Sequence, residues 1–208
     1  MAYSEFTLPK VLADFALTVD TSRDLFGQVP PVAFAFAAPA EAVLRDRVPL
    51  ALLNHTEKAR SELLVAPVLS ELWLKTDRRI SMYSGAALDV DVAAGLNGVC
   101  DYLIGRAPQL PAVTPPFFVV VEAKKDDIPG AFGPCAAEMV AALRMNREQH
   151  TGIETVYGCV TTGSNWRFLK LGGGHLEIDI AEYYLGQLDR VFGILLFIVG
   201  ANPLAVAA

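Results

Sequence analysis

The feature that most constrains this chain is an apolar run that ends in two charged residues on one side of a strand. Every residue from Phe117 to Val121 is apolar, and Glu122-Ala-Lys124 follows directly. A strand that is buried on both faces reads as a continuous apolar run, whereas a surface strand alternates. Because alternate side chains share a face, Glu122 and Lys124 point to the same side. The run therefore predicts a buried strand whose end enters a polar site.

A second apolar run, Gly98 to Ile104, carries a single acid, Asp101. Carboxylates from two neighbouring strands can hold one or two Mg²⁺ ions, which prefer oxygen ligands. Such a metal lowers the pKa of a bound water and neutralises phosphate charge, and a lysine beside the second acid can stabilise the developing oxyanion. A simple salt bridge at a strand end is the alternative explanation of Glu122 and Lys124.

The order of the expected elements is that of an α/β (α+β) fold with a mixed sheet flanked by helices. After an irregular segment, the N-terminal part favours helices over 41–53 and 56–74, with Thr56 as N-cap and Pro67 kinking or splitting the second. Strands are expected over 80–92, 98–104, 117–122, 156–161, 166–171 and 176–180.

The connection 107–116 is rich in proline and therefore stiff and extended. It joins two consecutive strands, which we expect to pair as an antiparallel hairpin. A helix should run over 134–149, beginning at Gly133-Pro134. We divide the single domain into a helical N-terminal extension (1–55), a core (56–180) and an apolar C-terminal helix (181–208).

Composition limits the class of protein. A chain of 208 residues with 53% hydrophobic and 19% charged residues forms one domain with a sparsely charged surface, and we expect a homodimer through an apolar surface or the C-terminal helix. Cys100, Cys135 and Cys159 lie in apolar runs and indicate buried free thiols in a reducing compartment.

The N-terminus lacks signal-peptide features, so we expect a cytoplasmic protein. The apolar stretch near the C-terminus is interrupted by glycine and proline, which argues against a membrane span.

Two further acids are candidate site residues. Glu138 is the only charged residue from Ala131 to Leu143, on a helix that is apolar nearly all round; a buried carboxylate needs a partner or a metal, although a carboxylate near a helix N-terminus is an equal explanation. Glu62 precedes an apolar segment and is either a metal ligand or the partner of Lys58 at i, i+4.

Other charged residues have weaker claims. Asp126 and Asp127 are expected in a solvated loop, and Asp89 and Asp91 on a polar strand face. The residues considered for phosphate contacts, with ordinary surface solubility as the alternative, are Lys125, Arg144, Arg147, Arg167 and Lys170.

The ordered set of motifs resembles the PD-(D/E)xK nuclease superfamily, and within it the nuclease domain of type I restriction subunits. The matching stretches are Asp101-Tyr-Leu-Ile, Val121-Glu-Ala-Lys124 and Thr161-Thr-Gly-Ser-Asn-Trp166-Arg-Phe168. The resemblance implies a restriction-endonuclease-like αβββαβ core. It also implies metal ligation by Asp101 and Glu122, with Glu62 as a further ligand, and a catalytic role for Lys124. We add Glu138 to the catalytic candidates because it is the one charge on an otherwise apolar helix.

The chain departs from that pattern in two places. Cys100 stands where the name-giving proline would be, and Pro134 occupies the neighbourhood in which many relatives carry a glutamine. The expected function is an Mg²⁺-dependent nuclease (with Mn²⁺ as substitute) that hydrolyses DNA. The alternative is a catalytically inactive nuclease-fold binding or assembly module, favoured by the net charge of −6, by the missing glutamine and by the apolar C-terminus.

Overall fold

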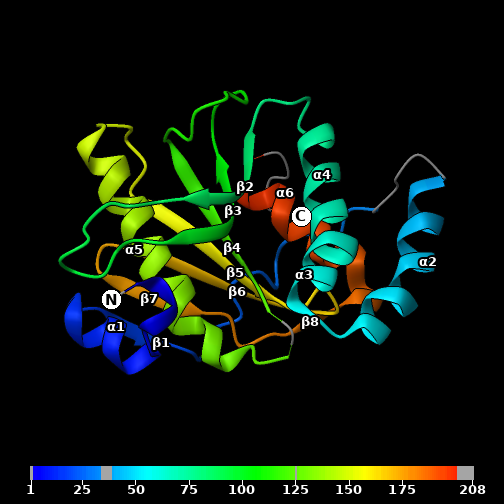
Figure 1. The fold of residues 1–208 in the computed structure, drawn as a ribbon, viewed down its shortest axis with the longest axis horizontal. Coiled ribbons are helices and arrows are strands. Elements are labelled where there is room, and N and C mark those ends of the chain that lie inside the picture. The colour runs from blue at the N-terminus through cyan, green and yellow to red at the C-terminus, as the bar shows by residue number, and fades with distance from the viewer. Residues whose placement is uncertain (1, 34–38, 125, 201–208) are drawn as a thin grey trace.

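The structure is a computed structural model that describes residues 2–33, 39–124 and 126–200. It is a mixed α/β fold in which one mixed sheet is flanked by helices on both faces (Figure 1). In chain order its elements are η1 (Tyr3–Glu5), α1 (Leu8–Asp14), β1 (Thr18–Asp20), α2 (Pro39–Asn54), α3 (Glu57–Arg60), the π-helical turn η2 (Ser61–Val65), α4 (Ala66–Lys75), β2 (Ser81–Ala87), β3 (Val99–Gly105), β4 (Phe117–Ala123), η3 (Pro129–Ala131), α5 (Phe132–Glu148), β5 (Thr155–Thr161), β6 (Asn165–Gly172), β7 (His175–Ile178), β8 (Tyr183–Tyr184), η4 (Leu185–Gln187) and α6 (Leu188–Ile198).

The sheet has the strand order β1-β7-β6-β5-β4-β3-β2, with β8 paired to β6. β2, β3 and β4 are successively antiparallel, whereas β4 and β5 are parallel and are connected through α5. The hairpin predicted between the second and third strands of the core is thus confirmed. The parallel step between β4 and β5 follows from the intervening helix, because a parallel neighbour needs a crossover connection.

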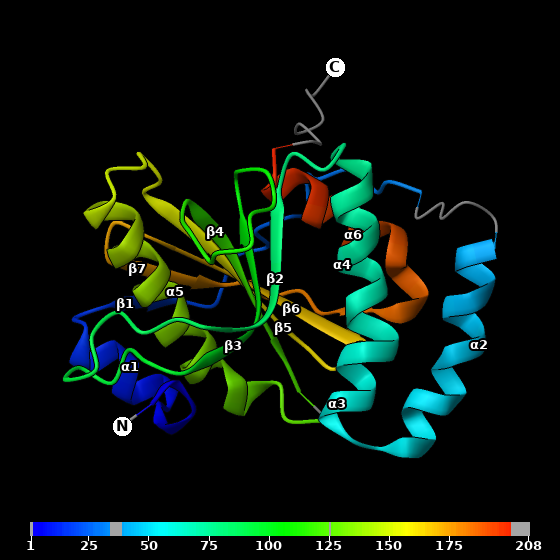
Figure 2. The same cartoon turned by 45° about the horizontal axis from the view of Figure 1, so that its top comes forward.

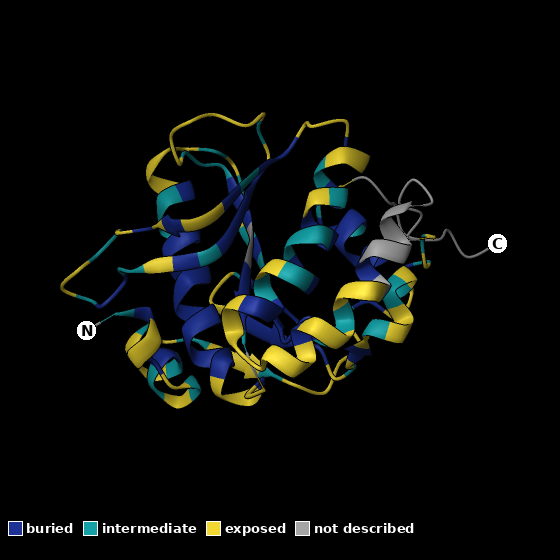
Figure 3. Cartoon of the chain, turned by 45° about the vertical axis from the view of Figure 1, so that its right-hand side comes forward, coloured by how far each residue is buried: buried dark blue, intermediate teal, exposed yellow. Residues whose placement is uncertain are grey.

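Two separate apolar cores cover the two faces of the sheet. α5 packs on one face with η1 and α1, and η2 and α4 pack on the other face with α2 and α6. Figures 1 and 2 show α5 and α4 on opposite sides of the strands. Figure 3 shows that burial is concentrated in the sheet and in the helix faces turned toward it, while the outer helix faces are exposed. α5 is buried over most of its length, as its uncharged sequence predicts.

The helix predicted over 56–74 is real but divided. Thr56 is its N-cap, and the Thr56 hydroxyl accepts a hydrogen bond from the backbone N–H of Ala59 (3.1 Å). A π-helical turn separates α3 from α4, and Pro67 lies at the start of α4. Proline lacks the N–H that a continuous α-helix would need, so the register changes just before it. The division was predicted, while the π-turn was not.

The two ends of the chain differ most from expectation. The N-terminal extension is only partly helical, since β1 adds a parallel edge strand beside β7, with Val19 opposite Leu176. The predicted C-terminal helix is shorter, because α6 covers Leu188–Ile198 only and residues 201–208 lie outside the described part. α6 buries its apolar residues in the chain's own second core, so it gives no support to the expected dimer.

Several smaller expectations also have an outcome. Cys100, Cys135 and Cys159 are buried free thiols, as predicted. The strand predicted over 80–92 ends at Ala87. Within the described part of the chain, no helix is both long and apolar enough to cross a membrane.

Contact between α5 and β5 fixes the position of the helix that carries Glu138, and one glycine makes that contact close. A Cβ atom on Gly158 of β5 would lie 2.5 Å from Met139 Sδ and 2.9 Å from Cys135 Sγ, both on α5. We therefore expect Gly158→Ala to lower the free energy of unfolding by about 1–3 kcal/mol, the usual cost of overpacking a core. Chemical denaturation of Gly158→Ala beside Gly186→Ala, whose added Cβ meets nothing within 4 Å, measures the difference. Equal stability of the two variants would contradict the close packing.

Candidate active site

The candidate site lies where β3 and β4 separate. Their pairing ends at Tyr102 opposite Val121. Two residues further along β4, the backbone N–H of Ala123 donates to Oδ2 of Asp101 (2.8 Å) instead of to a strand carbonyl. β4 stays paired to β5 beyond this point, since Lys124 N–H donates to the carbonyl of Thr161 (2.7 Å). The Asp101 carboxylate therefore sits in the opening between two strands.

Lys124 joins the acids of three elements. Its Nζ lies 2.7 Å from Oε1 of Glu122 and 3.4 Å from Oε1 of Glu57, the first residue of α3. Figures 1 and 2 both show the end of β4 beside α3. Asp101 also interacts electrostatically with Lys124 and Glu122. The sequence prediction that Asp101, Glu122 and Lys124 lie together is matched by this geometry.

Glu138 approaches the same cluster from the α5 side. It is only 2% exposed, and its hydrogen-bond partner is the thiol of Cys100 on β3. Its second oxygen, Oε2, is buried and has no hydrogen-bond partner among the described residues. An unpaired buried carboxyl oxygen is costly in a folded protein. A buried oxygen without a protein partner is expected at a site that binds a ligand, because the ligand then completes its interactions.

Burial and like charge raise the pKa of all three carboxyl groups. For Asp101, burial is the main cause, offset in part by the hydrogen bond from Ala123 N–H and then by Lys124; for Glu122, burial is again the main cause and Lys124 offsets it in part. The pKa of Glu138 is raised well above its ordinary value, by burial first and then by Glu122 and Asp101. Three carboxyl groups that disfavour each other's charge are an arrangement that a cation relieves.

Lys124 remains an ammonium group in this setting. Burial acts to lower its pKa, but the surrounding carboxylates, Glu122 first, raise it by more, so that the pKa lies above the ordinary lysine value. A lysine in this state cannot accept a proton near neutral pH. It can act only as a fixed positive charge and a hydrogen-bond donor.

Mg²⁺ fits the donor chemistry of this site, although the site is not a complete cage. Within the described residues, no group of three or more His, Cys, Asp or Glu side chains is already arranged to hold a metal ion. Mg²⁺ is usually held by one or two carboxylates, several waters and substrate phosphates, so a complete protein cage is not required. Asp101 and Glu122 supply such a pair, and Glu138, whose buried Oε2 is unpartnered, interacts electrostatically with both.

Glu62 does not join the cluster. Its carboxylate is exposed and pairs with Lys58 at 2.9 Å, which is the alternative that its spacing predicted. The acid that reaches Lys124 from this helix is Glu57, five residues earlier in the sequence. Nothing in the sequence singled out Glu57, because which helix residue faces the end of β4 depends on how α3 crosses the sheet.

The remaining charged candidates are mostly occupied elsewhere. Arg144 pairs with Asp91, Arg167 with Glu182 and Lys170 with Glu177, each at 2.7 Å. Asp126 and Asp127 are exposed, as predicted, and Arg147 is exposed as well. Asp89 accepts a hydrogen bond from the backbone N–H of Gly98 and so holds a turn rather than facing a site. Lys125 lies outside the described residues.

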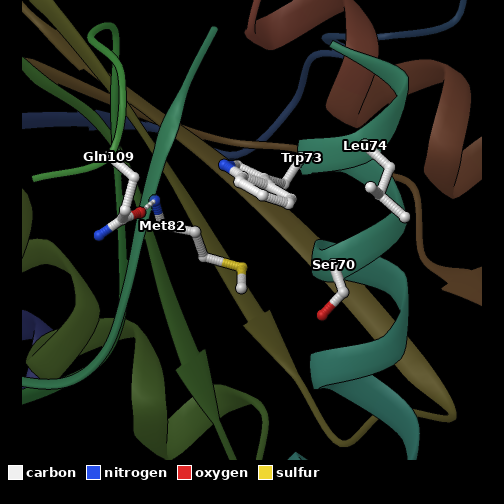
Figure 4. Close-up of a pocket in the computed structure, with 5 residues that line it drawn as sticks. All are labelled: Ser70, Trp73, Leu74, Met82 and Gln109. Atoms are coloured by element: carbon white, nitrogen blue, oxygen red, sulfur yellow. Dashed lines mark hydrogen bonds between the residues drawn. The ribbon is translucent and has the colours of Figure 1, made fainter. Parts of the chain in front are cut away.

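A pocket of about 360 Å³ lies at the other end of β3 from Asp101 and is separate from the acids. Ser70, Trp73 and Leu74 of α4 line it, together with Met82 of β2 and Gln109 of the loop between β3 and β4 (Figure 4). The Gln109 side chain accepts a hydrogen bond from the backbone N–H of Met82 (2.7 Å), which covers part of the exposed edge of β2. The pocket is mainly apolar and holds no acid or base that the candidate chemistry could use.

The fold and this site define a mixed α/β protein with a buried acidic cluster and one lysine at the end of a central strand. No family model matches the chain, and no curated protein or solved structure is significantly similar to it.

The raised pKa of Glu138 gives a sign for the dependence of stability on pH. A carboxyl group with a raised folded-state pKa favours the folded state below its ordinary pKa, and that contribution is lost as pH rises toward the folded-state value. Glu138→Gln removes this titration. The wild type should therefore lose stability relative to the variant as pH rises above about 4.5. The difference between their free energies of unfolding should change by up to about 1.4 kcal/mol per pH unit.

Urea denaturation between pH 4.5 and 8.5 measures this difference in Glu138→Gln. Glu148→Gln, at an exposed position of the same helix, is the matched control and should follow the wild type. A Glu138→Gln curve parallel to the wild-type curve would show that the buried carboxyl does not titrate in this range.

Proposed function

We propose that this chain is a metal-dependent nuclease that hydrolyses phosphodiester bonds, most readily those of DNA, with a restriction-endonuclease-like core. The observation that carries the proposal is the meeting of Asp101, Glu122 and Lys124 where β3 and β4 separate. The chain order of α4, β2, β3, β4, α5 and β5 supports it, since it is the αβββαβ order of that class. The buried, unpartnered oxygen of Glu138 supports it further.

In this proposal Asp101 and Glu122 hold Mg²⁺. When bound, the metal lowers the pKa of a coordinated water and neutralises charge on the phosphate. Ala123 N–H fixes Oδ2 of Asp101, and Oδ1 is the oxygen that would bind the metal in this proposal. Lys124 has a raised pKa and keeps its charge, so its role is to stabilise negative charge that develops on the phosphate oxygens rather than to remove a proton from water.

Glu57 is a second acidic partner of the Lys124 ammonium, at 3.4 Å, besides Glu122 at 2.7 Å. If Glu122 turns to a metal, Glu57 still keeps the ammonium beside the site. Glu57 is therefore a positioning residue in this proposal. Glu138 lies behind Glu122, where it limits how much negative charge the cluster can carry without a cation.

A second candidate is a binding or assembly module that keeps the nuclease fold without catalysis. Two observations favour it: Lys124 already neutralises Glu122 in an ion pair, and the described residues hold no ready-made group of three metal ligands. The expected homodimer belongs with either candidate and remains a prediction. The two candidates differ in whether the acids bind a divalent cation at all.

Cleavage of plasmid DNA tests the proposal directly. The wild-type chain with Mg²⁺ or Mn²⁺ should convert supercoiled plasmid, and Lys124→Ala should lower the rate by about 10²–10³, as expected for loss of one charge-stabilising donor. Lys58→Ala, at an exposed lysine paired with Glu62, is the matched control and should retain the wild-type rate. Activity that survives in Lys124→Ala would come from a contaminant or from another site.

Calorimetry separates the two candidates without an activity assay. Titration of Mn²⁺ into the wild-type chain should give binding heat that disappears in Asp101→Asn and in Glu122→Gln, because each variant removes one anionic ligand. Glu62→Gln should bind Mn²⁺ like the wild type, since Glu62 is paired with Lys58. Absence of any Mn²⁺ heat that depends on Asp101 and Glu122 would favour the inactive module.

A further inference from the structure

Arg60, the last residue of α3, is a buried cation without an acidic partner. The residue is only 8% exposed. Its Nη1 donates to the carbonyl of Thr162 (3.1 Å) and to Oγ of Ser164 (3.2 Å), both in the turn between β5 and β6. Its Nε is buried and has no acceptor, and no carboxylate of the described residues lies within ion-pair distance of it. Buried arginines are ordinarily paired with an anion, so Arg60 lacks the anionic partner that its buried charge needs.

The turn that faces Arg60 is built of hydroxyl groups and is packed tightly. The hydroxyls of Thr162 and Ser164 lie 3.0 Å apart, and the Thr162 hydroxyl accepts from the backbone N–H of Asn165 (3.1 Å). Gly163 has φ +77, and a Cβ there would lie 2.6 Å from Leu64 Cβ in the π-helical turn. The turn is therefore held against the same helical segment that carries Arg60. Ser164 keeps partial exposure, so its hydroxyl is within reach of a ligand.

This arrangement adjoins the acidic cluster. Arg60 follows Glu57 by three residues, a spacing that places Cβ atoms about 5–6 Å apart on one face of a helix. Glu57 touches Lys124, while Lys124 N–H bonds the carbonyl of Thr161, the residue before Thr162. Arg60 therefore contacts the residue that follows Thr161, and Thr161 is bonded to the backbone of Lys124.

We infer that Arg60, with the hydroxyls of Thr162 and Ser164, binds a phosphate group of the nucleic-acid backbone next to the phosphate attacked at the acidic cluster. The inference rests on the proposed nuclease function, which it extends by assigning a contact that positions the strand. A guanidinium suits this task because its planar donors match two phosphate oxygens, and hydroxyls are common partners of backbone phosphates. Such a contact strengthens binding without selecting a base sequence.

The test is the salt dependence of binding of a fluorescent DNA duplex, measured by anisotropy in Ca²⁺ to suppress cleavage. Arg60→Gln should bind about tenfold more weakly than the wild type, and the slope of log affinity against log salt should fall by about one. Arg60→Lys should recover the salt slope but only part of the affinity, since it keeps the charge and loses the planar fork. Arg79→Gln, which removes an exposed arginine at the other end of α4, should bind like the wild type.

A purely structural role for Arg60 predicts a different pattern. In that case Arg60→Gln would lower the unfolding temperature but leave the affinity and salt slope of the folded protein unchanged, and this result would overturn the inference. If Arg60→Gln does not fold, Ser164→Ala replaces it: a severalfold loss of affinity supports the inference, and wild-type affinity overturns it. Cleavage that depends on Lys124 but not on Arg60 would refute the phosphate site alone. DNA affinity that depends on Arg60, with cleavage indifferent to Lys124→Ala, would refute the nuclease assignment alone.

Discussion

The hydrogen bond from Ala123 N–H to the Asp101 carboxylate is the interaction on which the candidate site depends. A backbone N–H at the end of a strand pair needs an acceptor, and here a side chain supplies it where the neighbouring strand no longer does. The backbone N–H that β3 no longer pairs therefore keeps a hydrogen bond where the two strands separate. This hydrogen bond places the Asp101 carboxylate between the two strands, near Glu122, the penultimate residue of β4, and Lys124, the residue that follows the strand.

The electrostatics of the cluster follow from this placement. Three carboxyl groups from β3, β4 and α5 are largely removed from water, while Lys124 and its bond to Glu122 supply one compensating charge. Burial is the main cause of the raised pKa values of the acids, and like charge adds to it because one ammonium group cannot balance three carboxylates. The folded chain can therefore lower the electrostatic repulsion in this cluster in two ways: carboxyl groups stay protonated, or a cation binds. The same physical conflict accounts for both the expected dependence of stability on pH and the expected affinity for divalent metal.

Much of this arrangement could be predicted from the sequence, and the failures have a common cause. The unbroken apolar runs before Glu122 and around Asp101 predicted two central strands, and the uncharged helix predicted the burial of Glu138. These signals are local, since they depend on which faces of one element are buried. Glu57, Arg60 and the edge strand β1 were missed because their roles depend on contacts between segments distant in the sequence. A three-residue strand such as β1 carries too few residues to show a period of two.

The most direct test of the central claim is a crystal structure of the chain soaked with Mn²⁺, with anomalous scattering recorded at the manganese edge. The account predicts an anomalous peak between the carboxylates of Asp101 and Glu122, with the Lys124 ammonium moved off Glu122 and still in contact with Glu57. Crystals that hold Mn²⁺ elsewhere, or none at all, with the ion pair of Lys124 and Glu122 intact, would contradict it. The acidic cluster would then be a closed structural ion-pair network rather than a metal site.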